Sequence, residues 1–173
     1  MIKNGVYAAG VSILKNNKSL DTSSTINHAE NAIRNGLNGV FFFGSTGQSQ
    51  LLSISEKKDL ISKTATSKFK DQFYFGTGVN SLKDNLDLIR YCMEFGYQTF
   101  LIMPPAYYKG NTDKGIFNFY AEIIAQVPKI KIILYNFEKL SGYLFSANSV
   151  KGLVKNFPKQ IVGCKDSSYN LFE

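Results

Sequence analysis

The chain has 173 residues, of which 44% are hydrophobic and 19% are charged, and this ordinary globular balance argues against a disordered chain. Its formal net charge is +7, but the lysines are spread along the chain without a basic block that contains interleaved aromatic residues, so we expect no nucleic-acid binding. The sequence contains neither a signal-type N-terminal segment nor an apolar run of membrane-spanning length. We therefore expect a soluble cytoplasmic protein without a membrane partner.

Apolar, strand-type runs alternate with amphipathic, helix-type patterns along the whole chain. The strand-type runs lie at residues 5–12, 39–43, 72–79, 99–103, 131–137 and 161–164. Helical spacing of apolar residues predicts helices at residues 21–36, from residue 55 onward, at 82–95, at 113–126 and around 150–154. Six strands that alternate with five helices, without a linker or a shift in composition, predict one α/β domain over residues 1–173.

Such an alternation forms either an open doubly wound sheet or a (β/α) barrel. An open nucleotide-binding sheet usually carries GxGxxG in its first strand-to-helix turn, where this chain has VSILKNN at residues 11–17. The GTG at residues 76–78 is an isolated GxG, and the GSTGQS at 44–49 lacks the lysine of a phosphate-binding loop. These mismatches favour a barrel and leave a nucleotide-binding sheet as a weaker alternative.

Polar and aromatic residues of unusual type follow several predicted strands. A GSTG segment (44–47) follows the second strand, Tyr107 and Tyr108 follow the fourth, Tyr135 ends the fifth and Lys165 ends the sixth. In a parallel barrel the carboxyl ends of all strands open on one face. We therefore expect these residues to converge on one site.

Each of these residues has chemistry that fits the others. A GSTG turn offers backbone N–H groups and the hydroxyls of Ser45 and Thr46, which together suit a carboxylate. The phenol of Tyr135 can transfer protons. Lys165 follows an apolar run that we expect to be a buried strand, and desolvation there would free its amine to attack a ketone next to the bound carboxylate. The plainer alternative is a solvated lysine at the end of a strand.

The two cysteines and the single histidine suggest no metal site. Cys92 and Cys164 lie far apart and have no CxxC spacing, so neither a disulfide framework nor a zinc site is indicated. We expect both to be inert thiols in the core. His28 has no second histidine with which to share a metal ion.

Taken in order, the motifs of this chain resemble those of the dihydrodipicolinate synthase / N-acetylneuraminate lyase family of class I, pyruvate-dependent aldolases. The motifs that carry the resemblance are GSTG at 44–47, YY at 107–108, YN at 135–136 with LSG at 140–142, and GCKD at 163–166. The resemblance covers the whole chain. It implies a (β/α)8 TIM barrel, a homotetramer, and no metal or organic cofactor.

The resemblance also implies a role for each matched residue. Lys165 would form the Schiff base with the substrate, and Tyr135 would transfer protons. Ser45 and Thr46, with Gly47, would bind the carboxylate of the pyruvate moiety. Tyr108 would reach into the site of a neighbouring subunit, and Ser167 would contact the substrate.

One departure from the family pattern bears on the substrate. Synthase members carry an arginine five residues after the catalytic tyrosine, where it holds a semialdehyde carboxylate, but this chain has Leu140 there. We expect Leu140 to be a buried apolar residue, which cannot form the bidentate pair that an arginine forms. The expected activity is therefore of the N-acetylneuraminate lyase or 2-keto-3-deoxy-sugar-acid aldolase type. The alternative is 4-hydroxy-tetrahydrodipicolinate synthase of lysine biosynthesis.

The length of the chain departs from the family as well. A (β/α)8 barrel needs about 250 residues, whereas this chain has 173. We expect it to supply about the first six βα units and to be a fragment or a truncated product, because an open arc would expose sheet edges and apolar surface. For residues 1–173 by themselves, a catalytically silent half-barrel that binds 2-oxo acids is the alternative.

Overall fold

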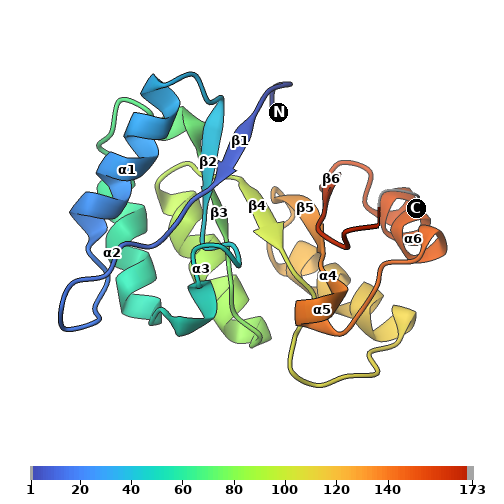
Figure 1. Cartoon of the computed structure of the whole chain (residues 1–173). Coiled ribbons are helices and arrows are strands. Elements are labelled where there is room, and N and C mark those ends of the chain that lie inside the picture. The colour runs from blue at the N-terminus through green and yellow to red at the C-terminus, as the bar shows by residue number, and fades with distance from the viewer. Residues whose placement is uncertain (1, 171–173) are drawn as a thin grey trace. The chain divides into compact units, whose positions relative to one another are not determined.

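The structure is a computed structural model that describes residues 2–170 (Figure 1). It divides into two compact units. The first comprises the residues up to Gly78 together with Leu88–Tyr97, and the second comprises Val79–Asp87 and the residues from Gln98 onward. Helix α3 (Leu82–Glu94) contributes its first part to the second unit and its last part to the first.

The first unit contains three parallel strands with β2 in the centre. These strands are β1 (Tyr7–Ala9), β2 (Gly39–Phe42) and β3 (Phe73–Gly76). They are connected through α1 (Thr22–Arg34), α2 (Ile54–Thr64) and the short 3-10 helices η1 (Ser49–Leu51) and η2 (Lys70–Gln72). The buried apolar residues of this unit include Val40, Phe42, Leu60, Ile61 and Phe75.

The beginnings of α1 and α2 follow local capping chemistry. Asp21 caps α1 by accepting the N–H of Ser24. Helix α2 begins earlier than the predicted Ser55, because Ser53 and Glu56 form a capping box in which each side chain accepts a backbone N–H of the other residue.

The second unit contains three further parallel strands, in which β5 is central. These strands are β4 (Thr99–Ile102), β5 (Lys131–Asn136) and β6 (Ile161–Asp166). The helices are α4 (Asp113–Gln126), α5 (Glu138–Ser141) and α6 (Ala147–Asn156). The order of strands and helices agrees with the prediction, except that α5 was not predicted because a helix of four residues shows no apolar period.

Residues 161–164 lie in a strand, as predicted, but the prediction that this strand is buried is wrong. Ile161 is buried, but Val162, Gly163 and Cys164 are exposed. Within the described part of the second unit β6 pairs with β5 alone and is an edge strand, so no neighbouring strand shields its other edge from solvent. For the same reason Cys164 is not the core thiol that we expected, whereas Cys92 is buried and burial raises the pKa of its thiol.

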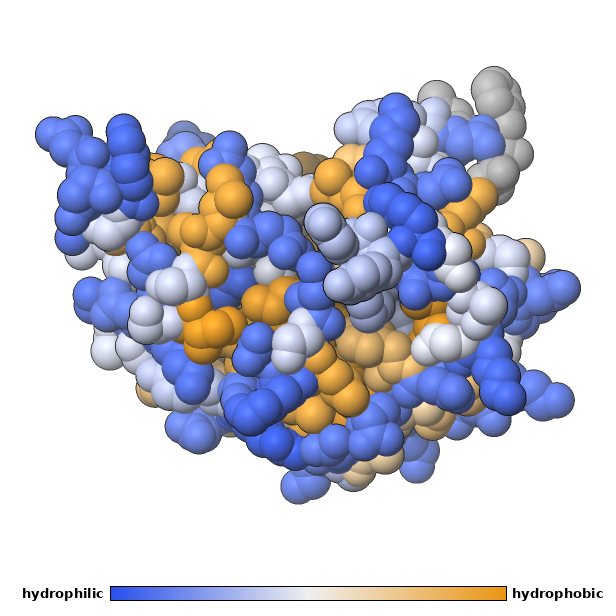
Figure 2. All heavy atoms as spheres, turned by 90° about the horizontal axis from the view of Figure 1, so that it is seen from below, coloured by the Kyte–Doolittle hydropathy of each residue, from blue (hydrophilic) through white to orange (hydrophobic). Residues whose placement is uncertain are grey.

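Apolar surface remains exposed in each unit. Exposed large apolar side chains include Leu51 in the first unit and Val154 and Val162 in the second. Figure 2 shows a face on which hydrophobic residues reach the surface between hydrophilic ones. Within residues 2–170, none of the helices has both the length and the apolar character that a membrane span requires.

Candidate active site

Lys165, Tyr135 and Ser167 lie together in the second unit. Lys165 on β6 is the register partner of Tyr135 on β5. Its Nζ lies 4.0 Å from the centroid of the Tyr135 ring and donates a hydrogen bond of 2.6 Å to Ser167 Oγ. Tyr135 is 5% exposed, and Lys165 is half-buried. The amine is therefore held against an aromatic face at the carboxyl ends of two adjacent strands.

Asn136 joins the ends of the two strands that carry this pair. Its Nδ2 donates a hydrogen bond of 2.7 Å to Asp166 Oδ1, and its carbonyl accepts the N–H of Ser167 at 2.8 Å. Hydrogen bonds from Ser168, and more weakly from Asn136, hold the pKa of Asp166 below its usual range. Asp166 is therefore an ionised acceptor at neutral pH, and its bond to Asn136 fixes the backbone that follows Lys165.

The LSG segment follows β5 and folds as α5. Ser141 Oγ donates to the carbonyl of Phe137, and it accepts the N–H of Tyr143. Gly142 has φ 72°, and a Cβ at this position would lie 2.3 Å from Lys109 Cδ. Leu140 is 42% exposed, so the prediction that it is buried is wrong. In this one-turn helix Ser141 is the buried residue, and the adjacent Leu140 points to a different side of the helix.

Tyr107 and Tyr108 lie in the segment that follows β4. Their rings contact each other edge to face with a centroid distance of 5.2 Å, and the Tyr108 side chain is 78% exposed. The N–H of Ala106 donates to Asn80 Oδ1, and Asn111 Nδ2 donates to the carbonyl of Tyr108. The backbone of this segment is therefore anchored while both phenols point away from the core.

The GSTG turn belongs to the first unit. The N–H of Gln48 donates to the carbonyl of Ser45 at 2.9 Å, and Ser12 Oγ donates to the carbonyl of Gly47 at 2.7 Å. A Cβ on Gly47 would lie 2.8 Å from the carbonyl oxygen of Gly10, so this residue must be glycine for the turn to pack here. Thr46 is exposed and Ser45 is half-buried, which leaves the Thr46 hydroxyl accessible to a ligand.

The structure thus brings together Lys165, Tyr135 and Ser167 in the second unit, and Ser45, Thr46 and Gly47 in the first. Ser12 was missed by the sequence analysis, because a single serine after a strand forms no motif. Within residues 2–170 no group of three or more His, Cys, Asp or Glu side chains could hold a metal ion.

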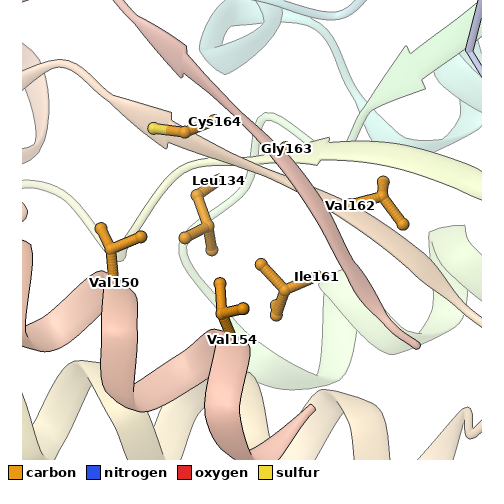
Figure 3. A pocket seen from close by; sticks show the side chains of 7 residues that line it. All are labelled: Leu134, Val150, Val154, Ile161, Val162, Gly163 and Cys164. Carbon is orange, nitrogen blue, oxygen red and sulfur yellow. The ribbon is translucent and has the colours of Figure 1, made fainter. Parts of the chain in front are cut away.

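An apolar hollow lies beside β6 and α6 (Figure 3). Its volume is about 300 Å³. Its lining consists of Leu134, Val150, Val154, Ile161, Val162, Gly163 and Cys164. No ionisable group other than a thiol lines it, and Lys165 is not part of the lining. The hollow therefore lacks the donors that a 2-oxo acid needs and is not the candidate active site.

Solved structures with similar folds define the class of this chain. Dihydrodipicolinate synthase from Agrobacterium tumefaciens matches with a TM-score of 0.91 and 27% identity, over 97% of this chain and 60% of that chain. The catalytic lysine mutant of sialic acid aldolase from Ruminococcus gnavus has a TM-score of 0.86 at 22% identity, over 96% of this chain and 54% of that one. YagE, a prophage protein from E. coli in complex with pyruvate, has a TM-score of 0.84 at 23% identity. The match covers 96% of this chain and 55% of YagE. The fold prediction is confirmed: the chain is a partial (β/α)8 TIM barrel.

The family is also shown by sequence. The Dihydrodipicolinate synthetase family matches residues 3–173, so the chain belongs to this family. A 4-hydroxy-tetrahydrodipicolinate synthase from Bartonella bacilliformis is 31% identical over 168 residues, which are 96% of this chain and 56% of the relative. The chain thus spans somewhat more than half the length of that relative. The prediction that residues 1–173 form one domain is not tested by these similarities and remains a prediction.

Proposed function

We propose that this chain carries the Schiff-base machinery of a class I aldolase or lyase that cleaves or forms a carbon–carbon bond of a 2-oxo acid, with pyruvate as one component. The observation that carries the proposal is the position of Lys165 Nζ, 4.0 Å from the Tyr135 ring centroid and hydrogen-bonded to Ser167 Oγ. A lysine held in this way can present its amine in a fixed direction.

In the proposed reaction the Lys165 amine attacks the ketone carbon of the substrate. The carbon–nitrogen bond forms, the ketone oxygen takes up protons and leaves as water, and an iminium remains. The iminium accepts the electron pair of the carbon–carbon bond as that bond breaks, and an aldehyde leaves. The resulting enamine takes up a proton on carbon, and water then releases pyruvate and the free amine. Tyr135 supplies and removes the protons, and Ser167 orients the amine before attack.

The GSTG turn is the proposed binding site for the substrate carboxylate. The hydroxyls of Ser45 and Thr46 and the backbone N–H groups up to Gly47 are donors in a turn that Ser12 holds in place. Such donors suit a carboxylate and leave the adjacent ketone free for attack. Neither a metal ion nor an organic cofactor is needed in this scheme, because the lysine itself is the electron sink once the iminium has formed.

For the assembly we propose a cytoplasmic homotetramer in which Tyr108 completes the site of a neighbouring subunit. The support within this chain is the exposure of the Tyr108 side chain, 78%, on a segment whose backbone is anchored through Asn80 and Asn111. An exposed phenol on an anchored segment can contact a second subunit without a change in backbone conformation.

For the substrate we favour a sugar acid of the N-acetylneuraminate or 2-keto-3-deoxy type, because Leu140 replaces the arginine that synthase members use. Synthesis of 4-hydroxy-tetrahydrodipicolinate is the second candidate, and the 31% identity to a protein of that name favours it. A silent half-barrel that binds 2-oxo acids without turnover is the third.

Borohydride reduction read by intact mass separates these candidates. With N-acetylneuraminate or a 2-keto-3-deoxy-sugar acid, an active lyase gives an adduct of pyruvate mass on Lys165, because cleavage precedes reduction. An adduct with the mass of the whole sugar acid indicates imine formation without cleavage. Consumption of aspartate semialdehyde in the presence of pyruvate would support the synthase instead. The Lys165→Ala variant is the control for each substrate.

A further inference from the structure

Lys57 of α2 is a buried lysine that the proposed chemistry does not use. It is fully buried, and its Nζ donates hydrogen bonds of 3.1 Å to the carbonyl of Thr77 and of 3.1 Å to that of Gly78. The Nζ also lies 5.9 Å from the centroid of the Phe43 ring. Lysines are almost never fully buried, since removing an ammonium from water is costly unless acceptors replace the water. The two carbonyls after β3 are such acceptors.

The segment that Lys57 holds packs against both ends of the GSTG turn. Gly78 has φ 58°, and a Cβ at this position would lie 2.1 Å from Ser49 Oγ and 3.0 Å from the carbonyl oxygen of Phe43. Phe43 immediately precedes Gly44, and Ser49 immediately follows Gln48. Gly78 therefore contacts the residues on both sides of residues 44–48.

The turn itself depends on these two flanking residues. The N–H of Ser49 donates to the carbonyl of Gly44 across the turn at 3.4 Å, and Ser49 is buried. Phe43 has φ 60°, a conformation that a non-glycine residue adopts only when its surroundings hold it. A shift of Gly78 would release the packing of Ser49 and of the Phe43 carbonyl together.

We propose that Lys57 is a positioning residue for the carboxylate-binding turn. Its ammonium fixes the carbonyls of Thr77 and Gly78, and Gly78 in turn fixes Phe43 and Ser49 at the two ends of the turn. The turn then presents the donors of Ser45 and Thr46 to a 2-oxo acid in one conformation. That the ligand of the turn is a 2-oxo acid rests on the proposed function. The effect of Lys57 on the conformation of the turn does not depend on it.

Hydrogen–deuterium exchange tests the structural part on the chain without ligand. Lys57→Met keeps the length of the side chain and removes its donors, and we expect amides in peptides covering 44–49 and 76–79 to exchange at least about tenfold faster while those of β1 and β2 stay protected. Lys57→Arg, which retains donors, should restore much of the protection. Lys58→Met is the matched control, because Lys58 packs on the ring of Tyr91 instead. Unchanged exchange in both peptides would overturn the proposal.

If Lys57→Met does not fold, Gly78→Ala tests the contact between Gly78 and the end of the turn, since the added Cβ would displace Ser49. The same two peptides should then exchange faster, and unchanged exchange there would again overturn the proposal.

Pyruvate titration with borohydride tests the link to the ligand. Lys57→Met should raise the pyruvate concentration for half-maximal adduct by about tenfold and keep the adduct yield at saturation, and Lys57→Arg should reverse much of this change. A merely structural role would lower the yield and leave the half-maximal concentration as it is. Equal half-maximal concentrations in the wild type and Lys57→Met would overturn the link to the ligand. If the wild type forms no adduct, the proposed function is contradicted. Hydrogen–deuterium exchange still tests whether Lys57 holds the turn.

Discussion

Lys165 and Tyr135 are register partners on adjacent parallel strands, and Lys165 Nζ lies 4.0 Å from the centre of the Tyr135 ring. The pairing of β5 with β6 therefore sets the position of the amine, and the bond between Asn136 and Asp166 reinforces it at the strand ends. A nucleophile whose place depends on strand pairing needs no mobile loop to become aligned.

Tyr135→Phe keeps the ring under Lys165 and removes the phenol. If Tyr135 transfers protons during imine formation, the rate of adduct formation with pyruvate should fall by about 10²-fold. The free energy of unfolding should change by no more than about 1.5 kcal/mol, as for the loss of one hydrogen bond. Quenched-flow trapping measures the rate, and urea unfolding measures the stability.

Tyr143→Phe is the matched control for that measurement, because the Tyr143 phenol is also buried but donates to Asp113 Oδ1, away from Lys165. It should leave the trapping rate within about twofold of the wild type, given that it removes one hydrogen bond elsewhere. Equal rates for Tyr135→Phe and wild type would remove Tyr135 from the proposed mechanism.

Ser167→Ala removes the hydroxyl that accepts the hydrogen bond from Lys165 Nζ. A hydrogen bond of this kind is worth about 0.5–1.5 kcal/mol, so the trapping rate should fall by up to about tenfold. Ser168→Ala, which removes a donor to Asp166 Oδ2, is the comparison. A larger loss in Ser168→Ala than in Ser167→Ala would contradict the role of Ser167 in orienting the amine.

Gly47→Ala should damage the carboxylate-binding turn, whereas Gly44→Ala should not. A Cβ at Gly47 would lie 2.8 Å from the Gly10 carbonyl oxygen, but a Cβ at Gly44 meets no atom within 4 Å. We expect Gly47→Ala to lower the free energy of unfolding by about 1–3 kcal/mol, the range for overpacking, and to weaken pyruvate binding. Urea unfolding measures the loss in the free energy of unfolding, and pyruvate titration measures the loss in binding. Similar losses in the two variants would show that the close approach of Gly47 to Gly10 has no consequence.

Glu56 should make the first unit sensitive to acid. Hydrogen bonds from the N–H of Leu20 and from Ser53 hold the pKa of Glu56 below its usual value. Because the pKa is lower in the folded state, the stabilisation is complete above the unfolded pKa of about 4.3 and is lost as the pH falls through the folded pKa. Glu56→Gln should therefore be less stable than wild type at pH 7, and the difference should shrink below about pH 4. Urea unfolding at several pH values tests this, and a difference independent of pH would contradict it.

Local features of the fold were predictable because they depend on neighbouring residues. The bounds of α4 and the alternation of strands with helices follow from side-chain type and spacing within one segment. The burial of β6 and of Leu140 was predicted wrongly. Burial depends on whether other elements of the fold cover a residue. The apolar sequence of a segment does not show whether it is covered.

The site was predictable only in part for a related reason. Lys165, Tyr135 and the GSTG turn stand at strand ends and carry recognisable chemistry. The residues that hold them, such as Ser12 and Lys57, act through contacts with carbonyl groups 20 to 35 positions away in sequence. A backbone carbonyl has no sequence signature, so a bond to it becomes visible only in the structure.

Borohydride reduction in the presence of pyruvate, followed by intact mass and peptide mapping, tests the central claim most directly. The account predicts one pyruvate-sized adduct, located on Lys165, and none in Lys165→Ala. The variant Lys159→Ala, at an exposed lysine before β6, should form the adduct as the wild type does. A chain that is folded by circular dichroism and forms no adduct, or forms it equally on other lysines, would contradict the claim that Lys165 is a Schiff-base nucleophile.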